Sequence, residues 1–393
     1  MTFKRVFLIV CDSLGIGSDT EAINYGDDGA NTFKHIADKL NGINIKEMES
    51  LGIGNILDIK GVKRIEPKNG FYGKCHEASV GKDTLTGHWE MMGIKTIKPF
   101  KTFTKNGFPK ELIDLLILKT GHKIIGNYAA SGTEILKELG EKSIKSGAMI
   151  VYTSEDSVLQ IAAHEKYFGL EELYRCCNIA REICMDEKYM VGRVIARPFI
   201  GEDKMSFTRT PNRHDYAVSP TSKTVLDSLK ENGYDVIAIG KINDIFNGMG
   251  ITDSIKTISN NDGMEKNLEL LNKDFIGLCF TNLVDFDAKY GHRRNVLGYH
   301  NAILEFDKEL SKLIKKLKDD DLLIITADHG NDPTWKGTDH TREYVPLLVY
   351  NNKISHGSLG LRTSFADIGA TIAENFKVNN PGIGISFLKE ITK

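Results

Sequence analysis

One stretch decides the expected fold: Leu322-Leu323-Ile324-Ile325-Thr326-Ala327-Asp328-His329-Gly330-Asn331. A short, unbroken apolar run of this kind is typical of a strand buried on both faces of a parallel sheet. In open α/β sheets, ligands bind beyond the carboxyl ends of such strands. Asp328 and His329 occupy that place, and a carboxylate beside an imidazole suits a divalent metal ion. A strand, a turn and a surface histidine would also explain these residues, so the interpretation depends on whether the pattern recurs.

The pattern recurs along the chain. Apolar runs at 6–11 and 275–284 also lead into acidic residues. Parallel strands point their carboxyl ends the same way, so the side chains that follow them can converge. Three carboxylates and three imidazoles are what two adjacent divalent cations need, and such mixed ligands admit Mn²⁺ or Zn²⁺. The candidate metal ligands are Asp12, Asp287, His292, Asp328, His329 and His340.

A polar, glycine-punctuated stretch at 79–93 contains a candidate nucleophile. It opens an expected helix at Thr84, and a hydroxyl group at a helix N-terminus can accept a phosphoryl group because the helix dipole favours negative charge there. Thr84 would then be activated by a metal ion rather than by a histidine base. A threonine before a helix also serves as a simple cap, and this alternative stays open.

The chain is expected to have an α/β fold with two domains. The βα rhythm of a mostly parallel sheet flanked by helices occupies residues 1–100 and resumes over 219–393, so 101–218 is predicted to be an inserted α+β cap domain. A helix is expected at 305–317 and a basic loop at 207–215. The inserted segment carries arginines whose forked geometry suits a phosphate, and Lys241 follows a later strand. These arginines are Arg193, Arg209 and Arg213.

Composition excludes several classes of protein. The 393 residues carry 51 basic and 53 acidic side chains, which gives no electrostatic case for binding nucleic acid or an anionic membrane. The six cysteines form no C-x-x-C pair, so a zinc ribbon or a redox motif is not expected. The N-terminal apolar run is too short for export, and no stretch reaches transmembrane length. We therefore expect a cytoplasmic protein.

The combination of Thr84 with the aspartate and histidine motifs resembles the alkaline phosphatase superfamily, which implies an alkaline-phosphatase-like core. Longer strings narrow the likeness, because they are similar to those of the bacterial phosphopentomutase family over essentially the whole chain. These strings are Gly81-Lys82-Asp83-Thr84-x-Thr86-Gly87-His88-Trp89-Glu90, Arg193 to Phe199, Phe207 to Tyr216, and Asp285-Phe286-Asp287-x-x-x-Gly291-His292-Arg293-Arg294.

The resemblance implies an isomerase that interconverts ribose 1-phosphate, or 2-deoxyribose 1-phosphate, and the 5-phosphate through a pentose 1,5-bisphosphate. Two divalent ions, usually Mn²⁺ in this family, would be bound. Thr84 would carry a phosphoryl group primed by a sugar bisphosphate such as glucose 1,6-bisphosphate. The implied roles place Asp12, Asp328, His329 and Thr84 on one metal, Asp287, His292 and His340 on the other, Arg193, Arg209 and Lys241 on the distal phosphate, and Ser154 and Asp156 on the ribose.

The partners that follow from this resemblance are small pentose phosphates, and we expect a monomer. Two other activities would use the same two-metal core: a phosphomonoester hydrolase, and a mutase like cofactor-independent phosphoglycerate mutase, whose nucleophile is a serine. A non-catalytic metal-binding protein is a further alternative. An assay of ribose 1-phosphate with and without a bisphosphate primer separates the mutase from the hydrolase, and intact mass after primer treatment tests the non-catalytic alternative.

Overall fold

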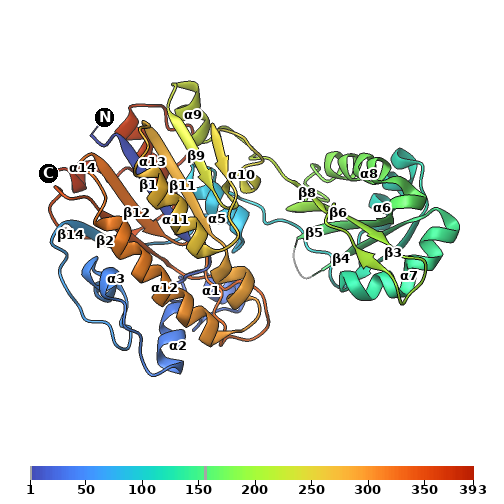
Figure 1. The fold of residues 1–393 in the computed structure, drawn as a ribbon, viewed down its shortest axis with the longest axis horizontal. Helices are drawn as coiled ribbons and strands as arrows, with labels where there is room; N and C mark the ends of the chain where they lie inside the picture. The colour runs from blue at the N-terminus through green and yellow to red at the C-terminus, as the bar shows by residue number, and fades with distance from the viewer. Residues whose placement is uncertain (1, 155–156) are drawn as a thin grey trace. The chain divides into compact units, whose positions relative to one another are not determined.

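A computed structural model describes residues 2–154 and 157–393. The chain forms two compact units: Met1–Lys98 with Ser219–Lys393, and Pro99–Val218. Figure 1 shows strands flanked by helices in both units. The chain therefore leaves the larger unit once, builds the smaller unit, and returns.

The larger unit is organised around an eight-stranded sheet, counted over the described residues, with the order β10-β9-β11-β1-β12-β13-β2-β14. The five strands from β10 to β12 are parallel, whereas β13 is antiparallel to both of its neighbours. Every residue of β1, β11 and β12 is buried, as the unbroken apolar runs predict. The strands are β1 (Arg5–Cys11), β2 (Gly70–Cys75), β9 (Asp235–Ile239), β10 (Asp253–Ile255), β11 (Gly277–Leu283), β12 (Asp321–Thr326), β13 (Val345–Tyr350) and β14 (Gly357–Arg362).

A buried ion pair lies at the amino end of the three central strands. Arg5 of β1 is opposite Gly277 of β11 and Asp321 of β12. The Arg5 guanidinium donates to both carboxylate oxygens of Asp321, each at 2.7 Å. This bidentate geometry favours one pairing of the strands. The same register brings Cys11 and Thr326, the last residues of β1 and β12, to a common edge.

Helices cover the faces of this sheet (Figure 1). One of them differs from the sequence prediction: the helix expected at 305–317 begins nine residues earlier, at Val296, because the Asn295 side chain caps it by accepting from the Gly298 backbone N–H. The helices are α1 (Ala22–Tyr25), α2 (Thr32–Lys39), α3 (Lys46–Ser50), α4 (Ile53–Ile56), α5 (Thr84–Met91), α9 (Val225–Glu231), α10 (Ile242–Ile245), α11 (Asn260–Leu270), η2 (Phe286–Gly291), α12 (Val296–Ile314), α13 (Ala366–Phe376) and α14 (Leu388–Ile391).

The smaller unit has its own mixed sheet, in the order β3-β4-β5-β6-β7, with β8 also paired to β6. The segment expected to be a basic loop, 207–215, instead contributes β7 and part of β8, because both pair antiparallel with β6. The elements are α6 (Lys110–Thr120), β3 (Ile124–Ala129), α7 (Gly132–Ser146), β4 (Met149–Thr153), β5 (Val158–His164), η1 (Glu165–Gly169), α8 (Leu170–Ile183), β6 (Arg193–Ile200), β7 (Thr208–Arg209) and β8 (His214–Ala217).

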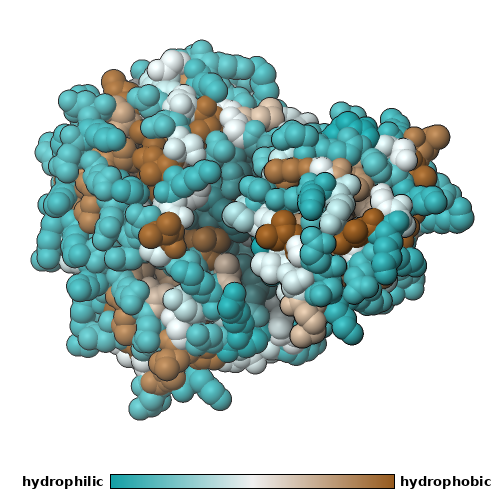
Figure 2. Space-filling model, turned by 45° about the vertical axis from the view of Figure 1, so that its right-hand side comes forward, coloured by the Kyte–Doolittle hydropathy of each residue, from teal (hydrophilic) through white to brown (hydrophobic). Residues whose placement is uncertain are grey.

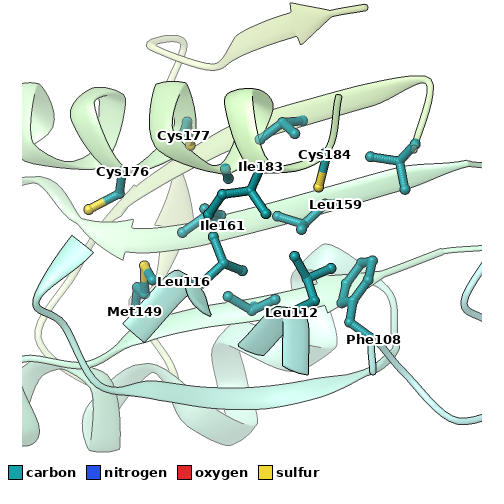
Figure 3. Close-up of a cluster of buried hydrophobic side chains, with 14 of the residues drawn as sticks. Phe108, Leu112, Leu116, Met149, Leu159, Ile161, Cys176, Cys177, Ile183 and Cys184 are labelled. Carbon is teal, nitrogen blue, oxygen red and sulfur yellow. The ribbon is translucent and has the colours of Figure 1, made fainter. Parts of the chain in front are cut away.

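A separate hydrophobic core supports the smaller unit. Figure 3 shows Leu112 and Leu116 of α6 and Ile183 of α8 gathered with Leu159 and Ile161 of β5. All these side chains are buried, so the unit has the independent core expected of a domain.

The exposed face in Figure 2 is mostly hydrophilic, and its hydrophobic residues are interrupted by polar ones. Over the described residues, no helix combines the length and the apolar character needed to cross a membrane.

Candidate metal centre

Two carboxylates and one imidazole meet at the carboxyl edge of β1 and β12. We call Asp12, Asp328 and His329 the carboxylate side of the site. One ligand atom from each lies within 4.8 Å of the others, and all three residues are buried. Asp12 follows β1 directly, and Asp328 and His329 follow β12 after one alanine. The strand pairing thus brings together residues more than 300 positions apart.

A second group lies on the loops after β11 and β12. We call Asp287, His292 and His340 the histidine side. His292 Nε2 is 3.0 Å from Asp287 Oδ2, and His340 Nε2 is 3.5 Å from Asp287 Oδ1. Asp287 lies in the first turn of the short helix η2, His292 directly follows that helix, and His340 lies in the segment between β12 and β13. All six aspartate and histidine residues predicted as metal ligands therefore lie in these two neighbouring groups.

His329 joins the two sides. Its ring centroid is 4.1 Å from that of His340, and its ligand atoms lie within 4.8 Å of those of Asp287 and His340 as well as those of Asp12 and Asp328. His329 Nδ1 is 3.0 Å from the Gly330 carbonyl oxygen, and His292 Nδ1 is 2.7 Å from the Thr338 carbonyl oxygen. Each Nδ1–H therefore donates to the backbone and leaves Nε2 facing the carboxylates, the arrangement typical of metal-binding histidines.

On the carboxylate side, one oxygen of each aspartate accepts a hydrogen bond from the protein and the other does not. Asp12 Oδ2 accepts from the Asn282 side chain at 2.9 Å, and Asp328 Oδ1 accepts from the Ser13 backbone N–H at 3.0 Å. Among the described residues, Asp12 Oδ1 and Asp328 Oδ2 accept no hydrogen bond, although His329 Nε2 lies 3.5 and 3.3 Å from them and His88 Nδ1 lies 3.2 Å from Asp328 Oδ2. Leaving such atoms buried and unpaired is costly. Two open oxygens beside an imidazole nitrogen fit a divalent ion.

The charges in this pocket interact strongly. Burial, with Asp328 and Asp287 nearby, raises the pKa of Asp12 to about 7, while His329 and Lys241 oppose the shift. Burial acts to lower the pKa of His329, but Asp328, Asp12 and Asp287 outweigh it and raise that pKa to about 9. The pocket therefore attracts positive charge, which a bound cation would supply.

Thr84 is the first residue of α5, and its hydroxyl oxygen is 3.2 Å from His329 Nε2. Asp83 caps the helix by accepting from the Thr86 backbone N–H. A Cβ atom on Gly87 would lie 2.3 Å from the Asp328 carbonyl oxygen, so only glycine lets α5 pack this closely against the end of β12. The helix cap and the glycine together place the threonine hydroxyl beside the carboxylate side.

Sequence reasoning gave no role to several polar residues that support the ligands. Asn282 is the penultimate residue of the apolar strand β11, which hid its contact with Asp12. The Asn331 side-chain amide donates to Asp287 Oδ1 at 2.7 Å, and its Oδ1 accepts from Arg294 Nη1 at 2.5 Å. Ser13 adopts a left-handed backbone conformation, with φ of 72°, that its bond to Asp328 stabilises. An Asp-Ser-x-Gly turn directly after a buried strand is the one local signal for this feature.

The predicted substrate residues lie in both units. Lys241 precedes α10 in the larger unit and lies close enough to Asp12 to affect its pKa. In the smaller unit, Arg193 is 3.7 Å from Asp215, and Arg209 lies on β7, where its side chain is exposed. Ser154 directly follows β4, whereas Asp156 lies outside the described residues.

The fold and the site define an α/β protein with a candidate two-cation centre at the carboxyl edge of a mostly parallel sheet. The model of the metalloenzyme superfamily matches residues 4–380, and the chain belongs to this superfamily. Divalent metal binding and an enzymatic function follow from that membership, and the predicted alkaline-phosphatase-like α/β fold is confirmed.

Solved structures resemble this fold over almost its whole length. The PH0037 protein from Pyrococcus horikoshii has a TM-score of 0.50 and 14% identity, covering 96% of this chain and 98% of its own. The Leishmania mexicana phosphoglycerate mutase has a TM-score of 0.47 and 13% identity, with 96% of each chain covered. A Vibrio parahaemolyticus protein in the alkaline phosphatase superfamily has a TM-score of 0.42 and 12% identity, covering 95% of this chain and 66% of its own. At these identities the likeness concerns the fold alone.

Proposed function

We propose that the protein is a phosphopentomutase, which moves a phosphoryl group between the 1- and 5-hydroxyls of ribose or 2-deoxyribose through Thr84. The observation that carries the proposal is the position of the Thr84 hydroxyl, at a helix N-terminus and 3.2 Å from His329 of the metal centre. The choice of a pentose phosphate is supported by the motif resemblance.

Divalent ions, most simply two Mn²⁺, would supply charge neutralisation for the phosphoryl group and favour ionisation of the threonine hydroxyl. Asp12, Asp328 and His329 would hold one ion, with Thr84 nearby. Asp287, His292 and His340 would hold the other. The N-terminus of α5 adds favourable backbone dipoles for the same negative charge.

The reaction needs two phosphoryl transfers. In the first, the phosphate on Thr84 passes to the free hydroxyl of the pentose phosphate: the bond from phosphorus to threonine oxygen breaks, a bond to sugar oxygen forms, and the hydroxyl proton is released. In the second, the other phosphoryl group of the resulting 1,5-bisphosphate returns to Thr84, and the freed sugar oxygen takes up a proton. A sugar bisphosphate such as glucose 1,6-bisphosphate would load Thr84 initially.

Cationic side chains would grip the phosphate that is not being transferred. Arg193 and Arg209 of the smaller unit and Lys241 of the larger unit are the proposed contacts, and Ser154 and Asp156 are proposed to bind the ribose. A guanidinium can bind a phosphate through two parallel hydrogen bonds, which fixes its orientation as well as its charge.

The experiment is an assay of ribose 1-phosphate with Mn²⁺, with and without glucose 1,6-bisphosphate. Ribose 5-phosphate that forms only after priming supports the proposal. Steady release of inorganic phosphate without ribose 5-phosphate would instead identify a phosphomonoester hydrolase. Conversion of 3-phosphoglycerate alone would identify a phosphoglycerate mutase.

A further inference from the structure

His88 is a completely buried histidine that the proposed chemistry does not use. It lies one turn after Thr84 in α5, and its Nδ1 is 2.9 Å from the Thr84 carbonyl oxygen and 3.2 Å from Asp328 Oδ2. Both neighbours are oxygens that accept hydrogen bonds. Nδ1 must therefore carry a proton, and its N–H donates to the backbone of the nucleophile beside a metal-binding carboxylate.

The other nitrogen of His88 faces the second carboxylate through one intermediary. His88 Nε2 is 3.3 Å from Asn282 Nδ2, and the same amide nitrogen donates to Asp12 Oδ2 at 2.9 Å. Asp12 requires a donor, which fixes the orientation of the amide. Since that nitrogen can only donate, His88 Nε2 accepts. These contacts place a ring proton on Nδ1 and leave Nε2 as an acceptor.

The ring itself has little freedom to move. It stacks on Phe280 of β11, with ring centroids 5.7 Å apart and an interplanar angle of 29°. The ring is held on both edges and on one face. A shift of the group bonded to one edge therefore also moves the group bonded to the other edge. A buried histidine that only satisfies the core would need a partner for each nitrogen. It would not need those partners to be the nucleophile's own peptide, one carboxylate of the metal site and the amide that donates to the other.

We propose that His88 is a positioning residue that sets the distance between Thr84 and the carboxylate pair Asp12 and Asp328. The hydrogen-bonded chain runs from the Thr84 carbonyl through His88 and Asn282 to Asp12. The inference rests on the proposed role of Thr84 as phosphoryl acceptor. His88, which is not one of the predicted metal ligands, would then align the Thr84 hydroxyl with the metal ion.

Two substitutions at His88 test the two ends of this series of hydrogen bonds independently. His88→Asn keeps an N–H close to the Nδ1 position but cannot reach Asn282, whereas His88→Gln keeps a polar group close to the Nε2 position and loses the bond to Thr84. We expect His88→Gln to slow phosphorylation of Thr84 by glucose 1,6-bisphosphate about 10- to 100-fold. We expect His88→Asn to slow it less and to weaken Mn²⁺ binding about 10-fold or more.

The measurements are intact mass against time for phosphorylation, and titration calorimetry with Mn²⁺ alone for metal affinity. His164→Asn is the matched control: His164 is also buried and uses both ring nitrogens, but it lies in the smaller unit, at the end of β5. If either His88 variant fails to fold, Asn282→Ala removes the link between His88 and Asp12 from the other end of this hydrogen-bonded series. It should then reproduce the loss of Mn²⁺ affinity.

Equal losses of both properties in the two His88 variants, or no loss in either, would overturn the proposal. Failure of the proposed function gives a different result: wild-type protein that takes up no phosphate from the primer. In that case the Mn²⁺ affinities of His88→Asn, Asn282→Ala and the control still test whether the chain positions Asp12.

Discussion

The carboxylate side and the histidine side of the metal centre are built in different ways. Asp12, Asp328 and His329 follow central strands directly and have side chains that are at most 1% exposed. Asp287 lies in η2, His292 and His340 lie on loops, and the three side chains are 9%, 30% and 12% exposed. The comparison teaches that one ion site is fixed by the sheet, whereas the other depends on loops that solvent can reach.

The largest effect should come from Thr84, which we place with the carboxylate side. Thr84→Ala should lower mutase activity by at least about 10⁴-fold, because it removes the oxygen atom that is proposed to carry the phosphoryl group. The protein should still bind Mn²⁺ on the histidine side. Mutase assays and titration calorimetry measure the two properties, and Thr84→Ser, which keeps a hydroxyl group, is the control. Full activity in Thr84→Ala would exclude this nucleophile.

A paired substitution tests the comparison itself. Asp328→Asn and Asp287→Asn each remove one charged ligand, and each should lower activity about 10³-fold through a loss of about 4 kcal/mol of charge stabilisation. Metal analysis of the purified variants should show that each loses a different ion. If both variants lose both ions together, the two sides form one cooperative site and the distinction made above is wrong.

Exposure predicts the order in which the ions leave. In a chelator titration, the ion on the histidine side should dissociate first, because its ligands lie on solvent-accessible loops. His340→Ala should lower metal affinity at that side about 10- to 100-fold and leave the other side occupied. Simultaneous release of both ions from the wild-type protein would contradict this prediction. His35→Ala, which alters a half-exposed histidine bonded to Asp332, is a suitable control.

The smallest effect should come from the support of the histidine side. Asn331→Ala removes the amide that donates to Asp287 Oδ1, and it should weaken metal binding at that side about 10-fold. Asn331→Asp places a second carboxylate against Asp287 and should be worse than alanine because like charges repel. An alanine variant with unchanged Mn²⁺ affinity would show that the loop positions Asp287 without this bond.

The sequence predicted the central strands because each is a short, unbroken apolar run that needs no partner to be visible. It did not predict β2 or β14, whose Gly70-Phe-Tyr-Gly-Lys-Cys75 and Gly357-Ser-Leu-Gly-Leu-Arg362 lack such a run. These strands form because β2 pairs with both β13 and β14. Pairing between distant segments supplies what local composition does not.

The types of ligand in the metal centre were also determined locally, by aspartate and histidine residues placed directly after strands or in the loops beyond them. Their arrangement into a carboxylate side and a histidine side, linked by His329, depends on contacts such as that between Ser13 and Asp328, which are 315 positions apart. His88 and Asn282 gained their roles in the same way, because one lies within a helix and the other within an apolar strand, where each resembles an ordinary core residue. The chemistry available to a single side chain can be predicted from the sequence. Its contact partners are determined only when the sheet brings the strand ends together.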